Sequence, residues 1–278
     1  MKKLIVSLGL ILTLSFGATL DEGVEAFEKG DYKKALIIFE ELSYKNNAEA
    51  QYGLGSLYYN GQGVIQDYSK AKEWYEKAAA QGFSDAQYNL GFLYYNGQGV
   101  KQDYKKAIEW YEKAAAQGFA AAQYNLGIMY ENGYGVKQDY KKAIEWYEKA
   151  AAQDDTEAQY NLGVMYSNGK GVKQDYLKAK ELYEKAAAQG DVRAQYNLGV
   201  FYANGEGVKQ DYFKAKEWYE KAAAQGDALA QNNIGFLYGN GQGVKQDFKK
   251  AKEWFGKACD GGEQMGCDNY KKLNQKGY

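Results

Sequence analysis

The chain has 278 residues and a formal net charge of -1, with 45% hydrophobic and 26% charged residues. This balance is typical of a folded protein and excludes a disordered chain. Loss of Lys2 and Lys3 with a leader would change the net charge from -1 to -3. Because the chain then has no basic excess to collect phosphates, we do not expect nucleic acid as a partner.

Residues 1–17 are predicted to be a signal peptide. Two lysines precede the apolar run Leu4–Phe16, and the small residues Ser15 and Gly17 predict cleavage before Ala18. The alternative is a membrane anchor, but the run is shorter than the about 20 residues that a helix needs to cross a bilayer. No cysteine stands directly after the run, so a lipid anchor is not indicated. We therefore expect a secreted or periplasmic protein without a membrane anchor in its mature form, in a compartment that permits disulfides.

Residues 18–49 are predicted to form an irregular helix pair that caps the N-terminal end. Within them, Asp21–Tyr44 carries apolar side chains at the spacing of a buried helical stripe, and Gly30-Asp31 marks the break between the helices. The stripe comprises Val24, Phe27, Ala35, Phe39 and Leu42.

Residues 50–265 consist of six copies of a 36-residue repeat. The clearest copy is Ala86–Ala121. A fixed period of this size is typical of a solenoid, in which each unit buries its apolar face only by stacking on its neighbours. We therefore expect one continuous core and one elongated domain. The other copies begin at Ala50, Ala122, Ala158, Ala194 and Ala230.

The first helix of each repeat is predicted from its apolar face and its end signals. In the second repeat this helix ends at Asn96-Gly97, a pair suited to the left-handed conformation after a helix. A loop then leads to Asp103, whose carboxylate can accept hydrogen bonds from the free amides that begin the next helix. The buried face comprises Ala86, Leu90, Leu93 and Tyr94.

The second helix of the repeat is predicted to end at Gly118. Gly91 and Ala107 recur in every copy and let the two helices approach closely around large rings, so we interpret the aromatic residues as core. On the outer face, Glu109 and Lys113 are spaced for an ion pair. The buried face comprises Ala107, Trp110, Tyr111, Ala114 and Ala115.

The motifs L-G-x-x-Y, N-G-x-G-V-x-Q-D-Y-x-K-A and W-Y-x-K-A-A recur through residues 50–265. In this combination the chain resembles the Sel-one-like repeat family, a relative of the tetratricopeptide repeats. The resemblance implies an all-α, right-handed superhelical solenoid of antiparallel helix pairs, whose first helices line a concave face that binds partners. Leu182 and Asp154 depart from the pattern, since other repeats carry Trp and Gly at these positions.

Cys259 and Cys267 extend the resemblance to the Helicobacter cysteine-rich proteins, which bridge most repeats with such a pair. Earlier repeats of this chain carry Ala and Gln at these positions. The resemblance therefore implies one disulfide, at the last junction, that holds the terminal helix Asn269–Lys276 within a C-terminal cap of residues 266–278. A redox or metal role for the two thiols is the alternative.

Histidine is absent from the sequence, which removes the Ser-His-Asp and Cys-His nucleophile systems and the imidazole zinc sites. We expect no metal and no cofactor. The cysteine-rich relatives are associated with penicillin binding and weak β-lactamase activity, so the S-x-x-K motif Ser167–Lys170 is of interest. It lies in a predicted interhelical turn and lacks the companion motifs S-D-N and K-T-G, so we interpret it as chance.

The paired carboxylates Asp154 and Asp155 are interpreted as caps and solvated linkers, because nothing around them suggests a pocket that would separate their pKa values. We therefore predict no catalytic residue. A weak β-lactam hydrolase remains an alternative that rests on family resemblance alone.

A row of tyrosine and asparagine side chains on the first helices is the candidate partner-binding site. Asn amides can pair with peptide bonds, and Tyr rings supply rigid apolar area with a polar tip, which suits an extended chain in a groove. The alternative is that the tyrosines pack between repeats and the asparagines satisfy neighbouring backbone. The row comprises Tyr88, Asn89, Tyr124, Asn125, Tyr160, Asn161, Tyr196, Asn197 and Asn233, and Tyr52 begins it.

Two further positions on these helices vary between repeats while the frame is kept. Such positions could read the side chains of a partner, although drift at exposed sites explains the variation equally well. We expect an exported scaffold that binds a protein or peptide, with a cell-wall fragment or a β-lactam as the alternative ligand. The variable residues are Phe92, Ile128, Val164 and Val200 at one position, and Tyr95, Glu131, Ser167 and Ala203 at the other.

Overall fold

The computed structural model describes residues 17–278, and the predicted leader lies almost entirely outside these residues. The described part of the chain folds into fifteen α-helices and divides into two compact units. Unit 1 runs to Met129 and includes Gly133–Lys137, and unit 2 comprises Tyr130–Asn132 and Gln138–Tyr278. The prediction of an all-α repeat fold is confirmed, whereas the superhelical course of the array stays a prediction.

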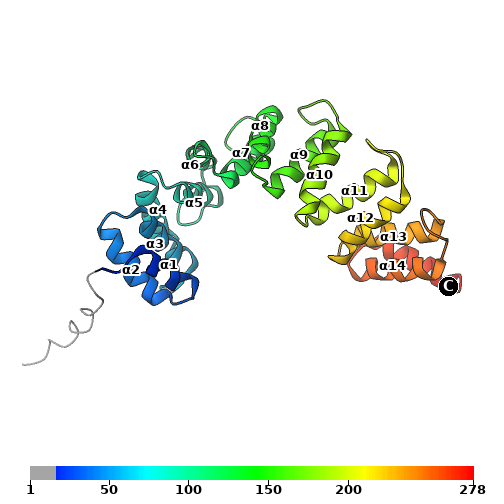
Figure 1. The fold of residues 1–278 in the computed structure, drawn as a ribbon, viewed down its shortest axis with the longest axis horizontal. Coiled ribbons are helices and arrows are strands. Elements are labelled where there is room, and N and C mark those ends of the chain that lie inside the picture. The colour runs from blue at the N-terminus through cyan, green and yellow to red at the C-terminus, as the bar shows by residue number, and fades with distance from the viewer. Residues whose placement is uncertain (1–16) are drawn as a thin grey trace, which may run out of the picture. The chain divides into compact units, whose positions relative to one another are not determined.

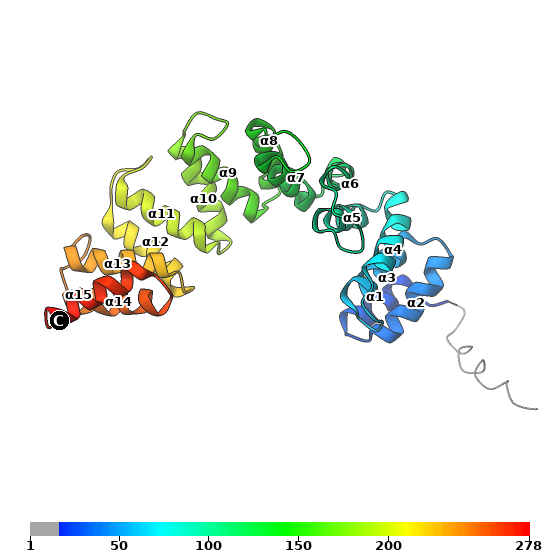
Figure 2. The same cartoon turned by 180° about the vertical axis from the view of Figure 1, so that it is seen from behind.

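Helices that follow one another in the chain pack side by side from α1 to α6 in unit 1 and from α8 to α15 in unit 2 (Figures 1 and 2). Unit 1 contains α1 (Leu20–Glu28), α2 (Tyr32–Tyr44), α3 (Ala48–Asn60), α4 (Tyr68–Ala80), α5 (Ser84–Asn96), α6 (Tyr104–Ala116) and most of α7 (Ala120–Asn132). Unit 2 contains α8 (Tyr140–Ala151), α9 (Thr156–Asn168), α10 (Tyr176–Ala188), α11 (Val192–Asn204), α12 (Tyr212–Ala224), α13 (Ala228–Asn240), α14 (Phe248–Asp260) and α15 (Gln264–Gln275). We call the odd-numbered helices from α3 to α13 the A helices and the even-numbered ones from α4 to α14 the B helices.

The predicted helix ends are confirmed. Gly97 follows α5 with φ 70°, and its N–H donates to the Leu93 carbonyl. The Asp103 carboxylate accepts from the amides of Lys105 and Lys106, both at 3.1 Å, and so begins α6. These local signals determine the helix pair because each satisfies backbone groups that the helix itself leaves unpaired.

The core of the repeats is built around an aromatic ring of the B helix, in most cases a tyrosine, set against a glycine of the A helix. Tyr111 is 1% exposed, and a Cβ atom on Gly91 would lie 2.5 Å from its ring. The glycine is therefore required by close approach, as predicted. The same pairing occurs at Gly55 and Tyr75, Gly163 and Tyr183, Gly199 and Tyr219, and Gly235 and Phe255.

The tryptophans of the B helices are less buried than predicted. Trp110 is partly buried and packs on a core cluster that spans two repeats, with Tyr75 from the preceding repeat and Leu90 from its own. The predicted ion pair of Lys113 with Glu109 is wrong, because the Lys113 ammonium lies 3.8 Å from the centre of the Trp110 ring. A cation over an indole ring is favourable in its own right, so the lysine stays at the ring that its stem already covers.

Glutamine side chains connect each repeat to the next. The Gln87 amide is buried and donates to the Ala79 carbonyl of the preceding B helix at 3.3 Å. Its oxygen accepts from Gln117 at 2.8 Å, and Gln117 also donates to the Gly82 carbonyl. We call this arrangement the glutamine ladder. It recurs with Gln51 and Gln81, Gln159 and Gln189, and Gln195 and Gln225.

At the last junction a disulfide replaces the ladder. Cys259 and Cys267 are bonded, with their Cα atoms 4.5 Å apart, as the resemblance implied. Their positions correspond to Ala223 and Gln231 in the preceding repeat. There the Gln231 amide donates a hydrogen bond to the Ala223 carbonyl. Gly261 replaces the second glutamine of the ladder, so the Gln231 Oε1 atom is buried without a partner among the described residues.

The two ends of the described chain differ in how well they were predicted. In the N-terminal pair, Ala35 and Phe39 are buried and the other three residues of the predicted stripe pack on their cluster. At the other end, the predicted start of the terminal helix at Asn269 is wrong. Helix α15 begins at Gln264, because the Glu263 side chain caps it by accepting from the Met265 amide at 3.1 Å.

Candidate partner-binding site

The tyrosines of the predicted row are half-buried and pack against the core. The Tyr88 ring lies 5.7 Å from Tyr111 of the next helix and 5.1 Å from Phe119, between centroids. Each ring therefore contributes one face to the core of its own repeat, and these contacts are not the packing between repeats that the sequence left as the alternative. The same contact with a B-helix tyrosine is made by Tyr52, Tyr160 and Tyr196.

Four asparagines of the row, Asn89, Asn125, Asn197 and Asn233, interact with tyrosine hydroxyls of the preceding repeat. Burial raises the pKa of the Tyr75 hydroxyl well above its usual value, and hydrogen bonds with Ser56 and Asn89 oppose this rise. Asn89 interacts in the same way with Tyr52. These amides are therefore used within the protein, and they do not face a partner as freely as the sequence suggested. The same role is taken by Asn125 toward Tyr111, by Asn197 toward Tyr160 and Tyr183, and by Asn233 toward Tyr196 and Tyr219.

In unit 1 the row opens into a hollow of about 250 Å³, which we call the aromatic hollow. Its walls are Tyr59, Tyr75, Tyr88, Asn89 and Phe92. The structure thus brings two row residues together with a residue of the variable set. Tyr59 was not predicted, although its place one repeat before the variable Tyr95 could have identified it.

The equivalent positions of unit 2 mostly carry smaller or polar side chains. Ser167, Ala203 and Gly239 occupy the position of Tyr59. Val164 and Val200 occupy that of Phe92, whereas Phe236 keeps an aromatic ring there. The remaining row residues Tyr124, Asn125, Tyr160, Asn161, Tyr196, Asn197 and Asn233 are all partly buried, on α7, α9, α11 and α13.

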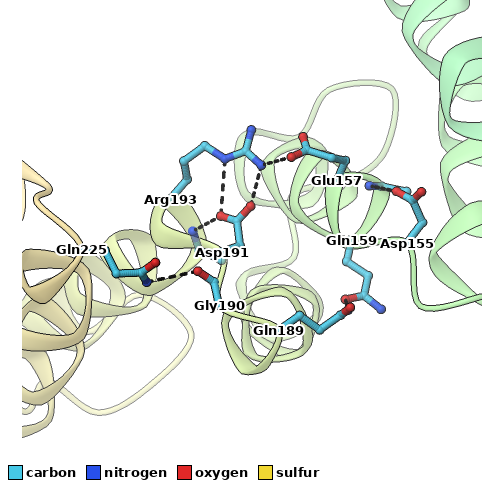
Figure 3. Close-up of polar contacts among 10 residues, drawn as sticks. Asp155, Glu157, Gln159, Gln189, Gly190, Asp191, Arg193 and Gln225 are labelled. Carbon is cyan, nitrogen blue, oxygen red and sulfur yellow. Dashed lines mark hydrogen bonds and ion pairs between the residues drawn. The ribbon is translucent and has the colours of Figure 1, made fainter. Parts of the chain in front are cut away.

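Arg193, the single arginine of the chain, lies at a junction of unit 2 (Figure 3). Its guanidinium forms ion pairs with Asp191 and, at 2.8 Å, with Glu157. It also covers the Tyr160 ring, with the guanidinium carbon 4.1 Å from the ring centre. Hydrogen bonds with these carboxylates raise the pKa of Arg193, so it remains charged and is committed to the junction. Tyr160 of the row is thus covered by a cation, whereas Tyr88 in unit 1 is covered by the Phe119 ring.

The residues considered for catalysis have structural roles. Ser167 lies in the last turn of α9, so its predicted place in the interhelical turn is wrong; the helix continues to Asn168 before Gly169 ends it. Its hydroxyl hydrogen-bonds with Tyr183, whereas the Lys170 ammonium lies 5.9 Å from the centre of the Tyr140 ring. This arrangement gives no support to a serine nucleophile activated by that lysine.

The interpretation of the paired carboxylates as caps is confirmed at Asp155, which accepts from the Ala158 amide at 2.8 Å and begins α9 (Figure 3). Burial raises the pKa of its carboxyl, and the hydrogen bond from that amide opposes the rise. Asp154 has φ 61°, a conformation that glycine provides at the same position of other repeats.

Within residues 17–278, His, Cys, Asp and Glu side chains do not gather in threes in a way that could hold a metal ion. In the same part of the chain no helix is both long and apolar enough to cross a membrane.

Comparison with known proteins places these features in context. The family model described as Sel1 repeat matches residues 48–83, 84–119, 120–155, 156–191, 192–227 and 228–263. No curated protein sequence matches the chain at a significant level.

Two solved structures are similar over most of the chain. One is c5321, a protective antigen present in uropathogenic Escherichia coli strains and displaying an SLR fold, with 36% identity over 93% of this chain and a TM-score of 0.90. The chain spans 56% of the length of that protein. The other is a Sel1 repeat protein from Oxalobacter formigenes, with 38% identity over 87% of this chain and 99% of that protein, and a TM-score of 0.76.

The cysteine-rich protein B of Helicobacter pylori is 30% identical over 48% of this chain and 96% of its own length, with a TM-score of 0.39. That likeness covers too little of the chain to carry the properties of the cysteine-rich proteins to it.

Proposed function

Because the chain belongs to the Sel1 repeat family, we propose that it is an exported scaffold that binds an extended polypeptide on its A-helix face, with the aromatic hollow of unit 1 as the anchor point. The observation that carries the proposal is the hollow itself, where Tyr59, Tyr88 and Phe92 surround an open space of about 250 Å³. Partly buried aromatic rings held by a core are typical of the anchor pockets that dominate binding energy at interfaces.

The chemistry of the hollow favours a polypeptide with an apolar or aromatic side chain. Tyr88 is held from behind by Tyr111 and Phe119, so its exposed face loses little conformational freedom on binding. Asn89 is engaged with Tyr52 and Tyr75, which leaves the rings as the main source of affinity. We therefore place the anchor in the rings. Tyr124 and Asn125 would extend this surface within unit 1, and the row residues of unit 2, from Tyr160 to Asn233, would form a surface of that unit.

Two features support export. The Cys259–Cys267 disulfide is a bond that persists in oxidising compartments. The predicted cleavage before Ala18 would leave the cap of α1 intact, because Thr19 provides that cap by accepting from the Glu22 amide. The mature chain would thus begin directly at its first folded element.

The test uses substitutions that other repeats already carry at the same positions. Phe92→Val copies Val164, and Tyr59→Ala copies Ala203, so both changes are compatible with the repeat fold. Purified mature protein would be screened against a library of random 12-residue peptides. We expect enrichment of peptides with an aromatic or large aliphatic residue, and loss of about tenfold in affinity in the double variant, the effect of about 1.4 kcal/mol.

The matched control is Val164→Ala with Ser167→Ala, two changes at the corresponding positions of unit 2 that leave the aromatic hollow complete. We expect this variant to retain peptide affinity within a factor of two. Equal loss in both variants, or binding of muramyl peptides with no peptide enrichment, would contradict the proposal.

A further inference from the structure

The loops that join A helices to B helices carry a second hollow, distinct from the aromatic one. In unit 1 it has a volume of about 620 Å³ and is lined by Lys101, Lys105 and Lys106, together with Tyr94 and Tyr104. In unit 2 an equivalent hollow of about 710 Å³ is lined by Lys216, Lys245, Lys249 and Lys250. The near-neutral net charge of the chain hides this gathering of lysines, because acidic residues balance them elsewhere.

The lysines of the unit 1 hollow are not held by carboxylates, although the Lys106 ammonium lies 5.2 Å from the centre of the Tyr94 ring. Among the residues that the structure describes, no ion pair involves Lys101, Lys105 or Lys106. By contrast, Lys72 and Lys180 pair with glutamates of their own helices. The single carboxylate in the wall of the hollow belongs to Asp103. Its carboxylate accepts from two backbone amides of α6, at 3.1 Å each. Three lysine charges therefore stand against one aspartate charge in the wall.

We infer that this surface, which we call the basic loop edge, binds an acidic polypeptide segment. Three ammonium groups supply single point charges that suit single carboxylates, whereas planar arginine forks, which match phosphate in two bonds, are missing from the edge. The Tyr94 and Tyr104 rings add apolar area between the lysines, which an acidic segment with interspersed apolar residues would cover. Duplex DNA carries one charge per about 1.7 Å, a density that three lysines and one aspartate do not match.

The unit 1 hollow is the better one to test. In unit 2 the Tyr278 ring already lies 4.6 Å from Phe248 inside the corresponding hollow, and Lys216 pairs with Glu220. The probe is fluorescent poly-L-glutamate, measured by anisotropy with the full mature chain at about 50 and about 300 mM salt, since exposed charges are screened over about 10 Å at 0.1 M salt.

The test variant is Lys101→Gln, Lys105→Gln and Lys106→Gln together. Its matched control is Lys113→Gln, Lys149→Gln and Lys185→Gln, which removes the same charge from the last turns of the B helices. We expect the test variant to lose tenfold or more in affinity at low salt and most of the salt dependence, and the control to stay within a factor of three.

Three outcomes would overturn the inference. The first is equal loss in both variants, which would mean that net charge and no particular surface attracts the probe. The second is binding of poly-L-glutamate that is unchanged in the test variant. The third is tighter binding of heparin or single-stranded DNA than of poly-L-glutamate, again lost in the test variant. The Phe92→Val and Tyr59→Ala variant separates this surface from the aromatic hollow, since it is expected to bind poly-L-glutamate unchanged.

Discussion

Helices α5 and α7 of unit 1 begin differently from the A helices of unit 2, whereas α3 of unit 1 is capped by the Asn47 side chain. In unit 1, α5 and α7 follow Phe83 and Phe119, which make no capping hydrogen bond with their side chains. Their rings instead pack on Tyr52 and Tyr88, each at 5.1 Å between centroids. In unit 2, α9, α11 and α13 follow aspartates that accept from backbone amides at 2.6 to 2.8 Å.

The residue before each A helix can therefore take one of two roles. It either caps the helix with a carboxylate or packs an aromatic ring on the A-helix face. A cap contributes about 1 kcal/mol and an aromatic pair about 0.5–1.5 kcal/mol beyond its buried area, so the two choices are close in free energy. Their surfaces are not alike, because the phenylalanines give unit 1 an apolar, aromatic A-helix face. The aspartates give unit 2 a polar one, to which Arg193 adds its charge.

The largest expected effect concerns the junction at which unit 2 departs most from unit 1. Replacing both Cys259 and Cys267 by Ser would remove a disulfide across eight residues of separation, at a cost of about 2.5 kcal/mol in the free energy of unfolding. Gln231 already lacks one hydrogen bond there, so no ladder can compensate. Hydrogen exchange should show lost protection in α14 and α15, with unit 1 unchanged. Equal loss in both units would contradict nearest-neighbour stacking.

The next prediction, of intermediate size, compares a capping aspartate with an aromatic ring at the residue before an A helix. Phe83→Ala removes a partly buried ring and should cost about 2 kcal/mol, below the about 3–5 kcal/mol of a fully buried one. Phe83→Asp should cost about 1 kcal/mol less than Phe83→Ala, because it restores a cap to α5. The matched variant Asp227→Ala should cost about 1 kcal/mol. Urea unfolding measures all three, and equal stability of the two Phe83 variants would show that a cap has no value in unit 1.

The smallest expected effect is a loss of stability at alkaline pH. It distinguishes the interior repeats, which have a buried tyrosine, from the last repeat, which has Phe255 at that position. Burial raises the pKa of Tyr219 in the folded chain, whereas an unfolded tyrosine titrates near about 10. Its stabilising contribution is therefore complete below pH 10 and is lost as the pH rises above it, by about 1.4 kcal/mol at pH 11. The Tyr219→Phe variant copies Phe255 of the last repeat. Between pH 8 and pH 11 its free energy of unfolding should fall by about 1.4 kcal/mol less than that of the parent. An unchanged pH dependence of unfolding in this variant would rule out the titration of Tyr219 as its cause.

The sequence by itself determined the local structure and the repeat. The cap at Asp103, the end at Gly97 and the contact of Gly91 with Tyr111 all follow from residues whose partners lie within one helix pair. Local backbone requirements of this kind recur with the 36-residue period and are readable from any copy. The disulfide was also foreseen, through resemblance.

Only the tertiary structure decided what each side chain outside the core does, because its partners lie about one repeat away in the chain. Asn89 was predicted to face a ligand, but stacking brings it to the hydroxyls of Tyr52 and Tyr75. Stacking likewise places Trp110 on a cluster that includes Tyr75 of the preceding repeat. Helical periodicity describes one helix, and it carries no information on which residue of the next repeat will lie opposite.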